Sequence, residues 1–195
     1  MPQEDSLLIL PAWLVDDPSH MPQANWGVRV VDGRINEVGP NATLSEQHPD
    51  DQTINAQESI LMPGFVNAHS HLYGVLAHGI PITSAPNGFW PFLEDFWWPL
   101  VEDRLDHEMI TAAADWACGE MLLTGTTTFC DVVEAPNCLP GALSAEKSVI
   151  EKWGLRGVLC FEATERLGRE VGLRGLEENV HFSESCQEGD LVQPM

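Results

Sequence analysis

The sequence is poor in basic residues, with nine lysines and arginines against thirty aspartates and glutamates in 195 residues. Only two of the nine are lysines, Lys147 and Lys152. The formal net charge of −21 would repel nucleic acid and anionic membranes, so we expect partners of neither kind. Two explanations of this charge stay open: a halophilic source, or an ordinary acidic enzyme whose charge is unevenly shared along a longer chain.

Long apolar runs are also missing, and none approaches the roughly 20 residues needed to cross a bilayer. The first ten residues, MPQEDSLLIL, begin acidic rather than basic and lack a small-residue cleavage site, unlike a secretory signal. The five cysteines form no CxxC pair, which argues against a zinc knuckle or a disulfide framework. The expected location is therefore the cytoplasm.

The first sixty residues have the pattern of β-structure. Apolar segments at 7–15, 27–31 and 34–38 are separated by turn residues, and Asp32-Gly33 between the last two predicts a hairpin. Residues 41–52 are polar and are expected to form a loop. We therefore predict a β-rich domain over residues 1–60.

Strands alternate with helices after residue 60. Strands are expected at 59–68, with an interruption at Pro63-Gly64, and at 126–133 and 155–163. Helices are expected between them at 107–123 and 141–153. A further helix is expected at 174–186 and the start of a strand at 191–195. The first helix should have Asp106 as its N-cap and should place Ile110, Ala114, Ala117 and Met121 on one face. The second helix should turn Ala142, Ala145, Val149 and Trp153 inward. This alternation predicts parallel strands with right-handed crossovers, and too few of them to complete a barrel or an open sheet.

His69 and His71 lie at the C-terminal end of the first strand in this series. Side chains two residues apart share one face of a strand, so the two imidazoles can converge on one cation. Imidazole is a suitable ligand for Zn²⁺, Fe²⁺ or Mn²⁺, and barrel enzymes keep their active sites at the carboxyl ends of strands. His pairs also occur on ordinary exposed strands, so the pair alone does not decide between a metal site and an exposed strand that binds no metal.

The residues around the pair resemble the first-strand signature of the amidohydrolase superfamily. Residues 61–71, LMPGFVNAHSH, combine a Pro-Gly step, an apolar strand, an Asn-Ala step and the two histidines. Residues 125–128 with Asp131 resemble the second-strand segment, and residues 154–162 resemble the third. The similarity runs from about Leu7 to Met195 and is strongest to the chlorohydrolase and aromatic deaminase branch. That branch includes guanine deaminase, S-adenosylhomocysteine deaminase, triazine hydrolases and the SsnA-type aminohydrolases.

The resemblance implies an α/β fold, the N-terminal part of a (β/α)8 metal-dependent hydrolase barrel. Residues 61–195 would form its first three β/α units and the start of the fourth strand, preceded by a small β-sandwich flanking domain in residues 1–60. His69 and His71 would bind one Zn²⁺, Fe²⁺ or Mn²⁺ ion per active site. The remaining ligands and the proton-shuttling glutamate are expected on later strands, beyond Met195.

The activity implied by the resemblance is hydrolytic deamination of an aromatic nitrogen heterocycle such as a purine. Hydrolysis of a halogenated ring, a cyclic amide or a cyclic urea is an alternative. A non-catalytic metal-binding relic of the fold is a third possibility. The full-length protein is expected to form a homo-oligomer, a dimer, and to take a small heterocyclic substrate.

Four further residues are candidate substrate contacts. Trp97 and Trp98 belong to an aromatic cluster in the long first βα connection, where barrel enzymes bind substrate. A packed lid or a subunit contact would explain that cluster equally well. His78 follows the histidine pair in a segment that lines the pocket entrance in relatives, although a solvated loop histidine is the simpler interpretation. Glu162 ends the third predicted strand and could reach the pocket or pair with Arg156 or Arg166 on the rim.

Overall fold

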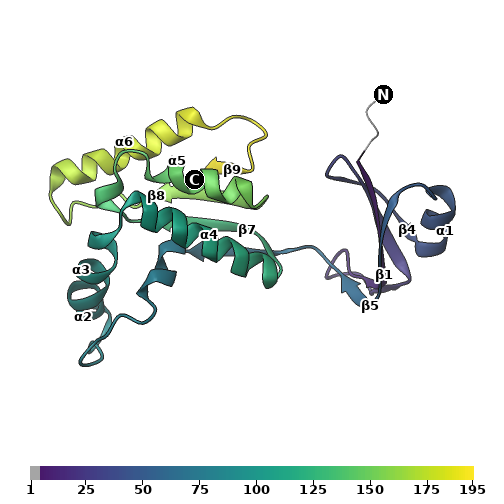
Figure 1. Cartoon of the computed structure of the whole chain (residues 1–195), viewed down its shortest axis with the longest axis horizontal. Coiled ribbons are helices and arrows are strands. Elements are labelled where there is room, and N and C mark those ends of the chain that lie inside the picture. The colour runs from purple at the N-terminus through teal and green to yellow at the C-terminus, as the bar shows by residue number, and fades with distance from the viewer. Residues whose placement is uncertain (1–4) are drawn as a thin grey trace. The chain divides into compact units, whose positions relative to one another are not determined.

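A computed structural model of the chain describes residues 5–195, and these divide into two compact units, one ending at Pro63 and the other spanning Gly64–Met195 (Figure 1). In the first unit the described strands form one five-stranded sheet with β2, β1, β3 and β4 in that order. The fifth strand pairs in parallel with β1. The strands are β1 (Ser6–Leu14), β2 (Gln23–Ala24), β3 (Trp26–Val31), β4 (Arg34–Pro40) and β5 (Gln52–Leu61).

The hairpin predicted at Asp32-Gly33 is confirmed. β3 and β4 pair antiparallel, with Val31 opposite Arg34. Both turn residues have positive φ, 48° at Asp32 and 73° at Gly33, as a two-residue type I′ turn requires. The loop prediction for 41–52 was wrong in part, because Asn41–Gln47 forms a short helix, α1, that buries Leu44. Since the described strands of this unit make one sheet, the second sheet of the sandwich stays a prediction.

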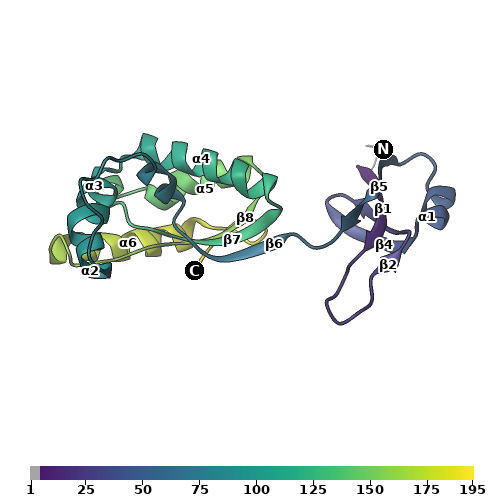
Figure 2. The ribbon, with the colours of Figure 1, turned by 90° about the horizontal axis from the view of Figure 1, so that it is seen from below.

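The second unit is built around four parallel strands in chain order, β6, β7, β8 and β9. Three long helices connect them, α4 packing against β7 and α5, and α6 packing against β8 and α5. Figure 2 shows α4 and α5 lying together over β7 and β8. The elements are β6 (Phe65–Ser70), α4 (His107–Leu123), β7 (Thr126–Val133), α5 (Ala142–Lys152), β8 (Arg156–Phe161), α6 (Arg169–Ser185) and β9 (Val192–Pro194).

The connection from β6 to α4 is long and mostly helical. Its first part is a 3₁₀ turn, η1 (Leu72–Ala77), and its aromatic part contains α2 (Phe89–Phe92), the π-helical η2 (Leu93–Trp97) and α3 (Trp98–Leu100). A further 3₁₀ turn, η3 (Glu102–Arg104), leads into α4. Asp106 is the N-cap of α4, as predicted, and its side chain accepts a hydrogen bond from the Met109 amide.

The core of this unit lies between the sheet and the helices. Alternate residues of β7 and β8 face the helix layer, so Phe129, Val133, Leu159 and Phe161 are buried there. α4 contributes Ile110, Ala114 and Ala117, the apolar face expected from the sequence. This packing fixes the strand directions and leaves the carboxyl ends of β6, β7 and β8 at one edge of the sheet.

Two helix predictions need correction. α5 buries Ala142, Leu143, Glu146 and Ile150, whereas Trp153 is partly exposed and follows the helix end. The inward face is therefore rotated from the one predicted, and it carries a glutamate. α6 begins at Arg169, five residues before the predicted start. Within residues 5–195, no helix is long and apolar enough to cross a membrane.

Candidate functional site

The imidazoles of His69 and His71 face each other at the end of β6. Their Nε2 atoms lie 3.2 Å apart, and the rings meet at an interplanar angle of 74°. The Nδ1 atom of His71 donates a hydrogen bond to the Val132 carbonyl, at 2.8 Å. Since a carbonyl can only accept, this bond places the ring proton on Nδ1 and leaves the Nε2 lone pair of His71 free.

This arrangement fits a metal ion held by both rings. Two nitrogens about 2.1 Å from one tetrahedral ion lie roughly 3.4 Å apart, close to the separation of the two Nε2 atoms. Fixing the tautomer of a ligand histidine through a backbone carbonyl is a common feature of metal sites. Within residues 5–195, no cluster of three or more His, Cys, Asp or Glu side chains could hold a metal ion. The pair would thus supply two ligands, where catalytic zinc sites use at least three.

Asp131 fixes the backbone that follows β6. It lies opposite Ser70 in the parallel pairing of β6 with β7 and is fully buried. One carboxylate oxygen accepts hydrogen bonds from the Ser70 hydroxyl and from the Leu72 amide, both at 2.8 Å. Burial raises the pKa of Asp131 to about 6, while these two bonds act in the opposite direction. Asp131 therefore anchors the turn that carries His71 and does not reach an open pocket.

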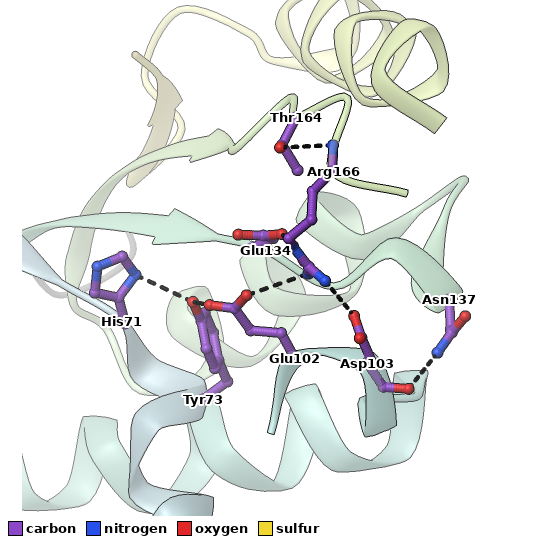
Figure 3. Close-up of polar contacts among 8 residues, drawn as sticks. All are labelled: His71, Tyr73, Glu102, Asp103, Glu134, Asn137, Thr164 and Arg166. Atoms are coloured by element: carbon purple, nitrogen blue, oxygen red, sulfur yellow. Dashed lines mark hydrogen bonds and ion pairs between the residues drawn. The ribbon is translucent and has the colours of Figure 1, made fainter. Parts of the chain in front are cut away.

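Tyr73 links the histidine pair to Glu102. The buried phenol donates a hydrogen bond to the Glu102 carboxyl at 2.9 Å, and its oxygen lies 3.4 Å from Nδ1 of His71 (Figure 3). The two rings meet edge to face, with centroids 5.6 Å apart. Burial and the neighbouring Glu102 raise the pKa of Tyr73, so the phenol stays neutral.

The Arg166 guanidinium is surrounded by three carboxyl groups (Figure 3). It lies beyond β8 and donates to Glu134 from Nε at 3.0 Å and from Nη2 at 2.6 Å. Nη1 donates to Asp103 at 2.9 Å, and Nη2 lies 3.4 Å from Glu102. Burial, followed by the charge of Glu134, raises the pKa of Glu102 to about 8. One guanidinium cannot balance three carboxylates, and the proton held by Glu102 reduces the excess negative charge.

Trp97 and Trp98 pack against residues near the histidine pair rather than against the histidines themselves. Trp97 packs against Tyr73, with ring centroids 6.0 Å apart, and lies over Gly74. The Trp98 ring stacks under the Arg166 guanidinium, 4.8 Å from ring centroid to Cζ. Both indoles thus contact residues of the Tyr73–Arg166 network, and their predicted contact with substrate stays a prediction.

Glu162 and His78 lie in different surroundings. Glu162 directly follows β8, and its amide donates to the Val133 carbonyl at 2.8 Å. Burial and the charge of Glu134 raise the pKa of Glu162, whereas His71 and Arg166 lower it, so the carboxyl lies within electrostatic range of the candidate site. His78 lines a surface hollow with residues of α4, including Ala112 and Trp116. Within residues 5–195, no hydrogen bond or ring contact joins His78 to the histidine pair.

Three residues of this site were missed in the sequence: Tyr73, Glu102 and Glu134. Glu134 follows the end of β7 as Glu162 follows β8, so the strand-end rule that selected Glu162 could have selected it. Tyr73 and Glu102 lie inside the long first connection and have no pattern that marks them. Arg166 was considered as a partner of Glu162, but it pairs with Glu134, Asp103 and Glu102 instead.

Comparisons with known proteins agree with this geometry. The model of the amidohydrolase family matches residues 60–190. A 5'-deoxyadenosine deaminase of Methanosarcina barkeri is 31% identical over 171 residues, which are 88% of this chain and 36% of the relative. A 5-methylthioadenosine/S-adenosylhomocysteine deaminase of Thermodesulfovibrio yellowstonii is 32% identical over 172 residues, 87% of this chain and 37% of the relative.

Solved structures show the same fold. A zinc-bound adenosine deaminase of Xanthomonas campestris superposes with a TM-score of 0.78 at 20% identity, over 96% of this chain and 41% of that one. A triazine hydrolase from Arthobacter aurescens gives a TM-score of 0.77 at 20% identity, over 98% of this chain and 46% of that one. The chain belongs to the amidohydrolase family, and it spans little more than a third of the length of the two curated relatives.

Proposed function

We propose that the whole protein is a metal-dependent hydrolase that deaminates an aromatic nitrogen heterocycle, with a purine nucleoside as the first candidate. The observation that carries this proposal is the 3.2 Å separation of the His69 and His71 Nε2 atoms, with the His71 tautomer set by Val132. The substrate class is supported by the names of the two relatives, which are deaminases of adenosine derivatives.

The proposed fold of the whole protein is a (β/α)8 barrel with a β-sandwich flanking domain. Residues 61–195 would be its first three β/α units and the start of the fourth strand, and residues 1–60 would belong to the sandwich. The four parallel strands in chain order support the barrel, and the greater length of the relatives supports further β/α units. Those units would bring the third metal ligand and the proton-shuttling glutamate.

His69 and His71 would hold one divalent metal ion, zinc in the first instance because three of the structural neighbours are zinc complexes. Such an ion acidifies water and polarises the carbon under attack, which is the chemistry hydrolytic deamination needs. The chain's own residues would fix the ligand rings: Val132 holds the tautomer of His71, and Asp131 holds the backbone after β6.

The candidate substrate contacts have unequal support. Glu162 has the strongest support, because its carboxyl lies at the edge of the sheet that carries His71 and interacts electrostatically with His71. Trp97 and Trp98 would act on the site through Tyr73 and Arg166. His78 has the least, since it faces α4. We also infer a cytoplasmic homodimer that takes a small-molecule substrate.

Ammonia release by the metal-loaded whole protein tests the function. We expect release from adenosine, 5'-deoxyadenosine or 5'-methylthioadenosine, with loss of activity in His69→Ala and His71→Ala. His181→Ala, which removes an exposed imidazole from α6, is the matched control and should behave like the wild type. Chloride release from a chlorinated triazine without ammonia release from any purine would instead indicate the chlorohydrolase alternative. A zinc-loaded protein that releases neither would contradict the proposal.

A further inference from the structure

The Arg166 side chain connects three segments that are distant in the sequence. It follows β8, whereas Glu134 follows β7, and Glu102 and Asp103 belong to η3 in the first connection. Arg166 is separated from Glu134 by 32 residues and from Glu102 by 64. Arg166 contacts all three of these carboxyl groups and so connects the ends of two strands with the first connection.

The contacts of Arg166 use all parts of its head group. Nε and Nη2 both donate to one Glu134 oxygen, Nη1 donates to Asp103, and the flat face stacks on Trp98. Glu102 and Glu134 are nearly inaccessible to solvent, each with a relative accessibility of 3%. Without Arg166 the buried Glu134 carboxylate would lose the cation that pairs with it, which is strongly destabilising, and Glu102 would lose its contact with Nη2.

One side of the cluster leads to the candidate metal ligand. Glu102 accepts the hydrogen bond of the Tyr73 phenol, and the phenol oxygen lies beside Nδ1 of His71 (Figure 3). Tyr73 has no second carboxyl partner among the described residues, so the place of Glu102 decides where the phenol points. We propose that Arg166 is a positioning residue that holds Glu102 against Tyr73 and thereby sets the phenol beside the His71 ring.

This role rests on the proposed metal site, and it extends that site by three residues, Tyr73, Glu102 and Arg166, along a chain of contacts. Glu102 is the necessary intermediate, because Arg166 touches neither His69 nor His71. The aromatic connection takes part through Trp98, whose stacking keeps the guanidinium plane in place. Arginine is suited to this position, since lysine offers neither a forked donor set nor a flat stacking surface.

A double-mutant cycle on the whole protein tests the proposal, with zinc affinity and kcat/KM as separate readouts. Arg166→Met should weaken zinc binding and lower kcat/KM, each by about ten-fold, the lower end of the range for outer-shell partners. Arg156→Met removes an exposed arginine from the start of β8 and is the control. In a Tyr73→Phe background, Arg166→Met should add no more than about two-fold, because the path to His71 is already broken.

The outcomes separate positioning from simple structural support. Equal effects of Arg166→Met with and without the Tyr73 hydroxyl, or zinc affinity equal to that of Arg156→Met, would overturn the proposal. If Arg166→Met does not fold, Arg166→Lys takes its place in the cycle and should recover only part of the wild-type values. A protein that binds zinc but releases no ammonia would refute the proposed function, whereas the zinc-affinity cycle would still decide the role of Arg166.

Discussion

Asp131 and Leu72 are joined by a hydrogen bond that crosses from β7 to the residue after His71, with 2.8 Å between the carboxylate oxygen and the amide nitrogen. The same oxygen accepts from the Ser70 hydroxyl, so both chain neighbours of His71 are tied to one buried side chain. The His71 ring is thus placed by strand pairing, by its own bond to Val132 and by the bonds of its neighbours.

Removing this anchor should loosen the metal site and destabilise the fold. Asp131→Ala leaves the Leu72 amide buried without an acceptor, which costs about 1–3 kcal/mol of unfolding free energy. Zinc affinity should fall with it. Asp131→Asn keeps one acceptor oxygen and should lose less unfolding free energy and less zinc affinity than Asp131→Ala. Urea unfolding and zinc titration of the two variants check this, and equal zinc affinity in Asp131→Ala and the wild type would show that the anchor does not position His71.

Glu146 is buried on the inner face of α5, and one of its carboxyl oxygens has no hydrogen-bond partner. Burial, followed by the charge of Asp131, raises the pKa of Glu146 well above its ordinary value. Because the folded-state pKa is raised, the stability contribution of this group is complete below the unfolded pKa near 4.5 and is lost as pH rises through the folded pKa.

Replacing Glu146 by an uncharged side chain of similar size should therefore increase the stability of the fold most at high pH. Glu146→Met is expected to raise the unfolding free energy by about 1–3 kcal/mol above neutral pH, because it removes an unpaired buried polar group. The gain should shrink as pH falls toward 5. Urea unfolding from pH 5 to 9 measures this, with Glu120→Met, which replaces an exposed glutamate of α4, as a reference for the loss of a surface charge. A variant less stable than the wild type at every pH would contradict this account of Glu146.

Trp98 is expected to affect catalysis through its stacking on Arg166. Trp98→Ala removes a cation–π contact worth about 0.5–2 kcal/mol, and in the whole protein it should lower kcat/KM several-fold while the zinc content stays intact. Trp90→Ala removes a neighbouring indole that contacts Trp98 but not Arg166, and should have a smaller effect. Unchanged kinetics together with an altered oligomer size would place the aromatic segment at a subunit contact instead.

The acidic composition makes a prediction about salt. If the source is halophilic, the melting temperature of the whole protein should rise as KCl increases into the molar range, because screening reduces carboxylate repulsion. Thermal melts at low and molar KCl decide between the two explanations of the net charge of −21. A melting temperature that is flat or falls would remove the halophilic explanation.

The local patterns in the sequence predicted much of the fold. The Asp32-Gly33 hairpin, the Asp106 cap and the bounds of α4 and β7 depend on neighbours in the chain, and all agree with the structure. The α5 face was predicted wrongly because Glu146 was counted as a surface residue and Trp153 as a core residue. In the structure Trp153 follows the helix and donates to Asp115 on α4. α1 was missed since it has no side-chain cap and buries only Leu44.

The site was predictable only in part for a similar reason. The spacing of His69 and His71 follows from strand geometry alone, so the sequence predicts that the rings share a face. The contacts from Tyr73 to Glu102 and from Arg166 to Glu134 join residues 29 and 32 positions apart, and only the folded chain brings them together. No periodic pattern marks such partners, because each belongs to a turn or to the residues just past a strand.

The central claim is that His69 and His71 are two ligands of one catalytic metal ion, and zinc stoichiometry tests it most directly. The whole protein, purified without chelator, should bind one zinc per chain, and so should His181→Ala. His69→Ala and His71→Ala should each lose most of the bound zinc, because each removes a ligand from the site. Full zinc occupancy in either variant would contradict the account and place the metal on other residues.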